Sequence, residues 1–304
     1  IFITFCALSK AKGMEINMKK TLGIIGLVIV TIIWGGGFVA SDIALNELSP
    51  FEIMSYRFLI ASIIMGVFAW RNLKTIRKDE IIYGSILGIA LFSGFALQII
   101  GLKYTTPSNN AFLTATNVVM VPFIAYFIGR KNLNKADIIG SFTTLIGVGV
   151  LSLQSNFSIG TGDLFTLFCA LGFAFQIYLT GILGKKIRPS ILNFLQMFTA
   201  FCLSIIGLLF SGSINLSLSK QGFSAIIYLG VVSTALCYFL QTAAQKHVDE
   251  TKSAIILSME AVFGTLFSII LLGEKPNLKM VVGGIMILSA VLISELQFFK
   301  EKQE

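Results

Sequence analysis

The chain alternates long apolar stretches with short polar ones. Seven stretches of more than 20 residues contain no Asp, Glu, Lys or Arg, and they cover residues 21–41, 81–102, 104–129, 138–162, 164–184, 189–219 and 221–245. A helix rises about 1.5 Å per residue, so about 20 residues cross the roughly 30 Å hydrocarbon core of a bilayer. Each stretch is therefore long enough to span a membrane as a helix.

Three further apolar segments carry a charge inside the span or at its edge. Arg57 lies in 51–70, Glu260 in 251–272, and Lys279 at the start of 278–297. All the segments together predict ten helices, near residues 22–41, 51–70, 81–103, 107–128, 136–153, 162–183, 190–211, 222–244, 251–272 and 278–297. The connections are too short for an inserted soluble domain. We therefore expect an all-α integral membrane protein with ten transmembrane helices.

The composition agrees with a membrane protein. Hydrophobic residues make up 55% of the 304 residues and charged residues only 12%, with a mean hydropathy of +0.86. Soluble domains carry about 25% charged residues, because their outer faces must be solvated. The composition therefore excludes a single soluble domain.

The net charge of +8 suggests either a nucleic-acid partner or a membrane topology. With a cytoplasmic N-terminus, 18 of the 23 Lys and Arg residues fall on the cytoplasmic side, and four fall outside, namely Lys103, Lys220, Lys275 and Lys279. An excess of Lys and Arg in cytoplasmic loops is typical of membrane proteins. We expect a multi-pass protein of the cytoplasmic (plasma) membrane, with both termini cytoplasmic and no nucleic-acid partner.

The first 17 residues differ from the rest of the chain. The chain opens with Ile1, and "IFITFCAL" is too short to span and lacks the basic residues that precede the apolar part of a signal peptide. We interpret Met18, which opens "MKKTLG", as the natural start. Residues 1–17 are then expected to be an extension that is not native or is disordered.

Cysteine and histidine give no sign of a metal site or a cofactor. Cys169, Cys202 and Cys237 lie within the predicted spans and Cys6 lies in the extension, so we expect thiols that act as small apolar groups. The single histidine, His247, lies in a short predicted loop. No spacing of these residues is typical of metal ligands.

The second half of the chain is similar to the first at a nearly constant spacing. "GRKNLNKADIIG" (129–140) matches "GEKPNLKMVVGG" (273–284) at an offset of 144, while Gln98 and Gln241 match at 143 and Pro50 and Pro189 at 139. We call residues matched in this way repeat partners. Five helices are an odd number, so the second half enters the membrane from the opposite side. The sequence predicts inverted repeats over residues 20–153 and 160–297.

Several stretches in both halves combine into a family signature, namely "IIWGGGFVASDIAL", "SPFEIMSYRFLIASIIM", "NNAFLTATNVVMVPFIAYFI", "GDLFTLFCALGFAFQIYLT" and "SAIILSMEAVFGTLFSIILLGEKPNLKMVVGGIMIL". Together they resemble the EamA family of the drug/metabolite transporter superfamily, over about residues 20 to 297. The resemblance implies a ten-helix exporter of small metabolites, often amino acids or related compounds, that works by alternating access. Such proteins often have Glu-Pro in the ninth helix. This chain has Glu260-Ala261 there, which puts a kink in that helix in doubt.

Glu260 is the strongest candidate for a functional residue. A carboxylate near the middle of a transmembrane helix is costly unless it faces a cavity, takes a proton or meets a partner. Its repeat partner is Asn117 in the fourth helix. Two interpretations stay open: Glu260 binds a substrate ammonium or exchanges a proton, or it makes an interhelical hydrogen bond.

Arg57 is the second charge within a span. Its long side chain reaches toward the external interface, where Asp42, Glu47 and Glu52 offer carboxylates. A structural ion pair is the favoured interpretation, and binding of an anionic group is the alternative.

Uncharged polar residues also lie within the spans. Individually they are expected to hold helices together, and collectively they are candidates for the lining of one polar cavity with Glu260. These residues are Gln98, Gln176, Gln196, Gln241, Asn117 and Tyr178. Trp34 in the first span is either a packing residue or a wall for an apolar or aromatic substrate.

Gly35, Gly36 and Gly37 follow Trp34. With the next three residues they match the dinucleotide pattern G-x-G-x-x-A, but that motif needs a strand before the turn, which an uncharged span excludes. Gly36, Ala40 and Ala44 recur every four residues, a spacing that lets helix backbones approach closely. Three glycines also weaken a helix by about 1 kcal/mol each. A hinge in a gate and simple close packing therefore both stay open.

Three classes of function compete. A secondary exporter fits the inverted repeats and the polar residues within the spans. An enzyme is disfavoured because the chain has no H-E-x-x-H or G-x-S-x-G motif, and no Walker motif indicates ATP drive. A multidrug or other small-solute permease is the nearest alternative, and a scaffold or receptor is the alternative of another class. The expected partners are a small-molecule substrate, the lipid bilayer and a coupling proton, with a homodimer left open.

Overall fold

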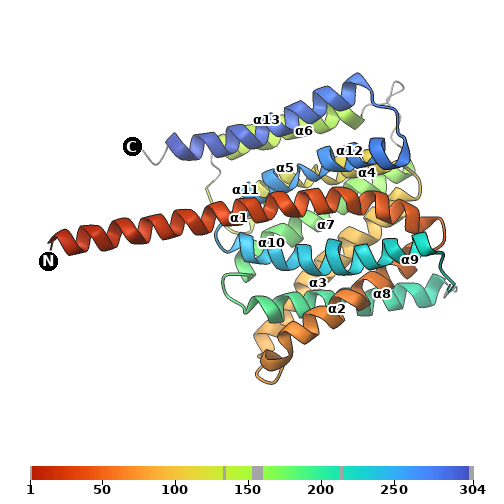
Figure 1. The fold of residues 1–304 in the computed structure, drawn as a ribbon, viewed down its shortest axis with the longest axis horizontal. Coiled ribbons are helices and arrows are strands. Elements are labelled where there is room, and N and C mark those ends of the chain that lie inside the picture. Colours follow the sequence, from red (N-terminus) through yellow and green to blue (C-terminus); the bar gives the residue numbers. More distant parts are fainter. Residues whose placement is uncertain (1, 133–134, 153–159, 212–214, 216, 301–304) are drawn as a thin grey trace.

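The fold is a bundle of helices (Figure 1). The computed structural model describes residues 2–132, 135–152, 160–211, 215 and 217–300, and it assigns no strand to them. The helices are α1 (Phe2–Leu45), α2 (Pro50–Leu73), α3 (Lys78–Leu102), α4 (Pro107–Thr114), α5 (Asn117–Phe127), α6 (Lys135–Ser152), α7 (Thr161–Leu183), α8 (Pro189–Ser211), α9 (Lys220–Ile227), the π-helix η1 (Tyr228–Leu236), α10 (Cys237–Gln245), α11 (Glu250–Leu257), α12 (Glu260–Leu272) and α13 (Leu278–Lys300).

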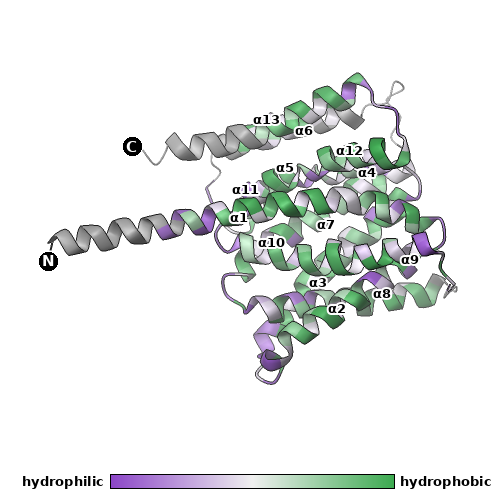
Figure 2. Ribbon diagram, in the orientation of Figure 1, coloured by the Kyte–Doolittle hydropathy of each residue, from purple (hydrophilic) through white to green (hydrophobic). Residues whose placement is uncertain are grey.

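Eight helical stretches of the described chain are long and apolar enough to cross a membrane. They are Asn17–Leu45, Pro50–Leu73, Lys78–Leu102, Pro107–Phe127, Thr161–Leu183, Pro189–Phe210, Lys220–Gln245 and Glu250–Leu272. Two further apolar stretches, Ile138–Gly147 and Leu278–Ala290, are shorter. Apolar residues make up much of the helices (Figure 2), and many large apolar side chains are exposed, as expected of a protein surrounded by lipid.

Two predicted helices are interrupted near their middle, so the prediction of continuous helices is wrong there. The helix predicted at 107–128 divides into α4 and α5, and the helix predicted at 251–272 divides into α11 and α12. At each break a hydroxyl competes with the helical backbone: Thr116 Oγ1 donates to the carbonyl of Leu113 over 2.7 Å, and Ser258 Oγ donates to that of Ile255 over 2.6 Å. The second break occurs although Ala261 stands where a proline was expected from the family.

The helix predicted at 222–244 is also irregular. It consists of α9, the π-helix η1 and α10. A π-helix places one more residue in each turn than an α-helix, and such segments are frequent at functional sites. Hydrophobic periodicity does not reveal it, because all three segments are apolar.

The first helix is longer than predicted. α1 begins at Phe2 instead of near residue 22, and its apolar span begins at Asn17. An ion pair of 2.6 Å between Lys19 and Glu15, one helical turn apart, supports this part of the helix. That residues 1–17 are an extension outside the first span stays a prediction, and the side chains of 1–14 and 16 lie outside the description.

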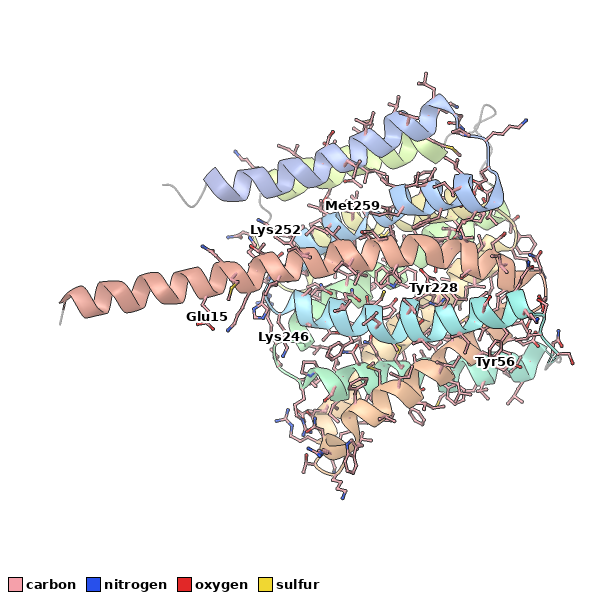
Figure 3. All side chains as sticks on the ribbon, viewed as in Figure 1. Glu15, Tyr56, Tyr228, Lys246, Lys252 and Met259 are labelled. Carbon is pink, nitrogen blue, oxygen red and sulfur yellow. The ribbon has the colours of Figure 1, made fainter. Side chains whose placement is uncertain are left out.

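The two ends of the bundle differ in charge. We call the end where α2, α7 and α10 finish and α3, α8 and α11 begin the basic end, because it carries Arg71, Lys74, Arg77, Lys131, Lys185, Arg188 and Lys246. Lys246 and Lys252 lie at this end, whereas Tyr56 lies toward the opposite end (Figure 3). At the basic end Arg188 donates to both carboxylate oxygens of the buried Glu80, over 2.9 and 2.6 Å.

The two halves of the chain are interleaved. The main helix contacts pair α2 with α8, α3 with α7, α1 with α12, and α6 with α13, so each joins the first half to the second. The pair of α6 and α13 lies to one side of the other helices (Figure 1). A cavity between the remaining helices is therefore bounded by both halves.

Gly35 allows α1 to touch α12. A Cβ atom at Gly35 would lie 2.5 Å from Cβ of Phe263 and 2.8 Å from the backbone nitrogen of Gly264. Backbone atoms cannot turn aside as the tip of a side chain can, so this contact requires glycine.

We expect Gly35→Ala to lower the melting temperature, because overpacking of this kind costs about 1–3 kcal/mol. Gly284→Ala is the matched control, since a Cβ there meets no described atom within 4 Å and alanine favours the helix. Thermal melting of the detergent-purified variants, followed by size-exclusion chromatography, measures both. Equal melting temperatures for Gly35→Ala and the wild type would contradict the contact.

Candidate functional site

A narrow cavity lies near the middle of the bundle. It encloses roughly 40 Å³ of space for a water-sized molecule, which is room for about three waters. Its walls come from α1, α2, α3, α4, α5, α7, η1, α10, α11 and α12, so both halves contribute. Ser41 and Leu102 extend the lining toward the end opposite the basic end.

Glu260 and Asn117 face this cavity from the first turns of two half-helices. Glu260 begins α12 and Asn117 begins α5, and each follows a break in its span. Among the described residues, nothing forms a hydrogen bond or ion pair with the Glu260 carboxylate, and Asn117 Oδ1 is buried without a hydrogen-bond partner. The N-terminus of a helix favours negative charge, which suits a carboxylate at the start of α12. Both groups are available to a ligand.

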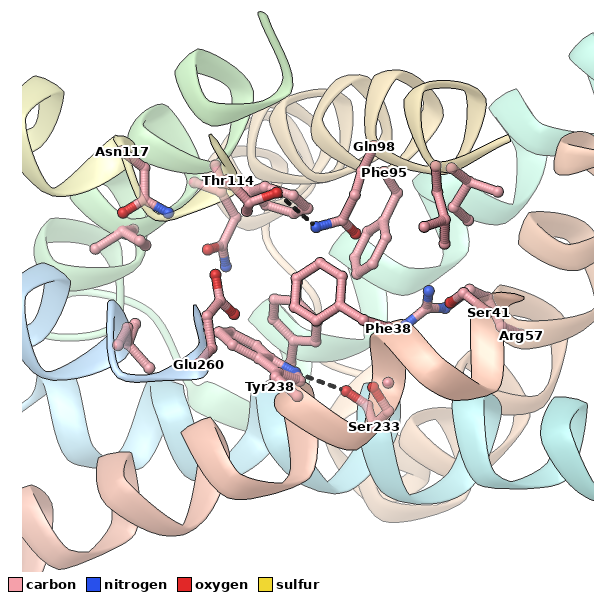
Figure 4. Close-up of a pocket in the computed structure, with 18 residues that line it drawn as sticks. Phe38, Ser41, Arg57, Phe95, Gln98, Thr114, Asn117, Ser233, Tyr238 and Glu260 are labelled. Atoms are coloured by element: carbon pink, nitrogen blue, oxygen red, sulfur yellow. Dashed lines mark hydrogen bonds between the residues drawn. The ribbon is translucent and has the colours of Figure 1, made fainter. Parts of the chain in front are cut away.

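Arg57 reaches the cavity from the side opposite Glu260 (Figure 4). Its Nε and one terminal nitrogen donate to Thr234 Oγ1 over 3.0 and 2.9 Å, and its guanidinium carbon lies 4.0 Å from the ring centre of Phe95. The predicted ion pair with Asp42, Glu47 or Glu52 is not formed within the described chain. Glu52 instead accepts from the backbone of Ser49 and Asn215.

Glu47, like Glu52, is engaged elsewhere. Glu47 accepts from the backbone nitrogen of Ser219 over 2.8 Å, and hydrogen bonds from Ser219 hold the pKa of Glu47 below its ordinary value. Arg57 is only 2% exposed, and its charge is compensated by a hydroxyl and an aromatic face. Its other terminal nitrogen makes no hydrogen bond among the described residues.

Aromatic rings form much of the apolar lining, and four of them contact one another. Trp34 contacts Tyr238 at 5.1 Å between ring centres, Phe95 contacts Phe173 at 5.0 Å, and Phe95 contacts Tyr238 at 6.2 Å. Trp34 and Phe173 are separated by the repeat offset of 139, and Phe95 and Tyr238 by that of 143. The contact of Trp34 with Tyr238 is therefore matched, across the two halves, by the contact of Phe173 with Phe95.

The π-helix and α1 hold Trp34 in place. Trp34 Nε1 donates to the carbonyl of Ser233 over 2.8 Å, and the Tyr228 hydroxyl donates to the carbonyl of Ile33 over 2.7 Å. Both bonds join α1 to η1. The indole ring is therefore fixed by hydrogen bonding as well as by packing.

Amide side chains supply the uncharged polar part. Gln98 donates to Thr114 Oγ1 over 3.2 Å (Figure 4), and Gln176 and Gln241 exchange two hydrogen bonds of 3.3 and 3.2 Å. Gln98 and Gln176 line the cavity, and Gln241 lies behind Gln176. The predicted polar residues thus meet near the cavity, except for Gln196 and Tyr178.

Tyr178 and Gln196 lie away from the lining. Both are buried, and a Cβ added to Gly129, at the basic end, would lie 2.7 Å from the Tyr178 hydroxyl.

The three consecutive glycines make different contacts. Gly37 lines the cavity, and Gly35 packs on α12. A Cβ atom added to Gly36 would lie 2.6 Å from the Tyr228 hydroxyl. These contacts agree with close packing, and a hinge stays a prediction.

The lining also includes residues that the sequence did not single out. Among these are Phe38, Phe95, Phe173, Ser233 and Tyr238. Thr234, which holds Arg57 from outside the lining, was not singled out either. Comparison of aromatic positions at the repeat offsets would have selected three of them. The described residues contain no group of three or more His, Cys, Asp and Glu side chains that could hold a metal ion.

Comparison with known proteins places this architecture in a family. The model of the EamA-like transporter family matches residues 21–153 and again 160–296. The chain is similar to an uncharacterized transporter of Archaeoglobus fulgidus, with 32% identity over 95% of this chain and 90% of that protein. It is also similar to the uncharacterized transporter YyaM of Bacillus subtilis, with 25% identity over 90% of this chain and 94% of that protein.

A solved crystal structure shares the fold. It superimposes with a TM-score of 0.75 over 92% of this chain and 97% of that chain, at 14% sequence identity. The family match covers both halves of the chain, and the Archaeoglobus relative covers nearly all of it. The chain is a membrane transporter that belongs to the EamA-like transporter family of the drug/metabolite transporter superfamily.

Proposed function

We propose that the chain is a secondary active transporter that exports small zwitterionic metabolites, such as amino acids or related compounds, across the cytoplasmic membrane. The observation that carries this proposal is the pair of unpaired charges at one cavity. Glu260 offers a carboxylate to a substrate ammonium, and Arg57 offers a guanidinium to a substrate carboxylate. Trp34, Phe95 and Tyr238 form apolar walls for the part between the two charged groups.

The architecture that fits this function is ten spans in two inverted repeats, residues 20–153 and 160–297. The break between α4 and α5 and the break between α11 and α12 are separated by 143 residues, as are Asn117 and Glu260. The matching ring contacts of Trp34–Tyr238 and Phe173–Phe95 support the same relation. Transporters of this kind bind substrate near the midplane, at broken helices between the repeats.

The small volume of the cavity supports alternating access. About three waters fit it, so substrate entry requires the surrounding helices to part. Proton exchange at Glu260 is proposed to couple transport to a proton gradient, because an ionised carboxylate without substrate is costly in an apolar bundle. The direction of transport, outward, follows the family resemblance.

A multidrug permease is the nearest alternative. A cationic drug would use Glu260 and the aromatic walls, but it would leave the buried guanidinium of Arg57 without a counterpart. A scaffold or receptor would need neither charge at a cavity. Arg57 therefore favours a substrate that carries both charges.

Removal of the Glu260 charge tests the proposal. In proteoliposomes we expect Glu260→Gln to lower counterflow of apolar amino acids by about tenfold or more, because a hydrogen bond to a charged group contributes about 1.5–3 kcal/mol. Asp79→Asn, at an exposed carboxylate of the basic end, is the control and should transport normally. Normal counterflow by a well-folded Glu260→Gln protein would overturn the assignment of this residue.

The proposed orientation puts the basic end in the cytoplasm. In a chain whose cysteines are replaced, Lys220→Cys should react with a membrane-impermeant maleimide in intact cells, and His247→Cys should react only after permeabilisation. Both positions are exposed. Labelling of His247→Cys in intact cells would show the reverse orientation.

A further inference from the structure

A cluster of buried polar side chains lies between the cavity and the basic end, outside the cavity lining. Its members are uncharged, and each is 0% exposed: Thr180, Asn193, Gln196, Gln241, Thr242 and Gln245. Amide groups in an apolar bundle are costly to bury, so a cluster of this size needs an explanation.

Internal hydrogen bonds satisfy only part of the cluster. Gln176 donates to Thr180 Oγ1 over 3.0 Å, and Gln196 and Thr242 both donate to Asn193 Oδ1, over 2.7 and 3.3 Å. Gln196 Oε1, Gln245 Oε1, Glu250 Oε2 and Ser253 Oγ are buried and find no hydrogen-bond partner among the described residues. Most buried polar atoms in proteins are paired, so four unpaired oxygens in one region indicate groups that pair with something else in another state.

The repeat offsets relate this cluster to the lining of the present cavity. Five lining residues that lie in the half of the bundle away from the basic end have their repeat partners in the cluster. Ser41, Arg57, Gln98, Ile99 and Leu102 correspond to Thr180, Gln196, Gln241, Thr242 and Gln245, at offsets of 139 and 143. Inverted repeats exchange their conformations when a transporter switches, so the partners of residues that line the cavity in one state line it in the other.

We propose that Thr180, Gln196, Gln241, Thr242 and Gln245 line the substrate path at the basic end when the transporter opens there. This proposal rests on the proposed transport function. The path is polar and uncharged, since Gln196 stands where the other side has Arg57. A substrate carboxylate that is held by Arg57 on one side meets only amides and hydroxyls along these five residues on the other.

An ion pair closes this path in the present structure. Lys131 Nζ lies 2.9 Å from Asp249 Oδ2 and also donates to Glu250, whose side chain is 1% exposed. Burial lowers the pKa of Lys131, but its bonds to Glu250 and Asp249 outweigh burial and raise that pKa above the ordinary value. Lys131 thus stays charged, and it ties the loop after α5 to the first turn of α11.

The backbone around the ion pair is shaped for the closed state. Arg130 has a φ of 51°, in the left-handed region, and the Lys131 nitrogen donates to the Ala125 carbonyl over 3.2 Å. This turn directs Lys131 toward α11. A Cβ atom at Gly181 would lie 3.0 Å from Cβ of Glu250, so glycine lets α11 approach α7 closely.

At the opposite end, the corresponding contact is a hydrogen bond and not an ion pair. There Ser108 at the start of α4 donates to Glu274, and no cation joins them among the described contacts. The repeat partners of Ser108 and Glu274 are Thr251 and Arg130. Each of these is the direct neighbour of a residue in the ion pair, Glu250 or Lys131. Loss of the Lys131 ion pair should therefore open the basic end rather than the other.

Cysteine accessibility tests the path. In a chain with the four native cysteines replaced, Thr180→Cys and Thr242→Cys are treated with a membrane-impermeant methanethiosulfonate from the basic-end side. We expect Lys131→Gln to raise both labelling rates by about fivefold or more and to slow the labelling of Ser41→Cys from the other side. Lys186→Gln, a nearby charge change outside the ion pair, is the matched control and should leave the rates unchanged.

Persistent protection would overturn the proposal. Thr180→Cys and Thr242→Cys that stay unreactive with Lys131→Gln, while the exposed His247→Cys reacts, show that the cluster never lines a path. If Lys131→Gln does not fold, Asp249→Asn combined with Glu250→Gln removes the same ion pair, and the same rates decide.

The labelling needs no substrate, so the two proposals fail separately. Unreactive cysteines in a protein with normal counterflow overturn the path alone. Reactive cysteines in a protein without counterflow of any zwitterion overturn the proposed function.

Discussion

An ionised side chain inside an apolar bundle must be compensated by its surroundings, and two such groups here face one cavity without pairing. The guanidinium of Arg57 is held by a hydroxyl and an aromatic ring, while Glu260 has no hydrogen-bonding partner within the described chain. Leaving such charges apart costs free energy that a single ion pair would recover. A ligand with both charges, or a proton on Glu260, supplies the missing compensation. The broken helices place Glu260 and Asn117 at the cavity, and hydrogen bonds hold the Trp34 indole in its wall.

Duplication explains why one set of helices provides both a binding cavity and its closure. Asn117 and Glu260 begin half-helices at matching places, yet only one of them is charged. Likewise, Arg57 is charged whereas its repeat partner Gln196 is not. Similar backbones in the two halves therefore carry different charges, and under the proposed function this difference orients the substrate. The ring contacts, in contrast, match between the halves, since Trp34–Tyr238 corresponds to Phe173–Phe95.

Much of this fold could be predicted from the sequence, because membrane spans depend on the length of apolar runs. The approximate limits of eight apolar spans and the position of Glu260 within one of them follow from such patterns. The helix breaks at Thr116 and Ser258 could not be predicted, since they depend on hydroxyl groups bonding to carbonyls three residues earlier. The partner of Arg57 was wrongly expected to be a carboxylate, because Thr234 and Phe95 are distant in sequence and ordinary in type. The ion pair of Lys131 with Asp249 and Glu250 could not be predicted either, since these partners lie 118 and 119 residues away in sequence.

The central claim is that the cavity recognises both charges of one small molecule. Equilibrium binding to the purified wild-type protein tests it most directly, with phenylalanine, its carboxamide and its deaminated acid as matched ligands. The account predicts that phenylalanine binds about tenfold or more tightly than either analogue, because each analogue leaves Arg57 or Glu260 uncompensated. Equal affinity for all three ligands would contradict the account.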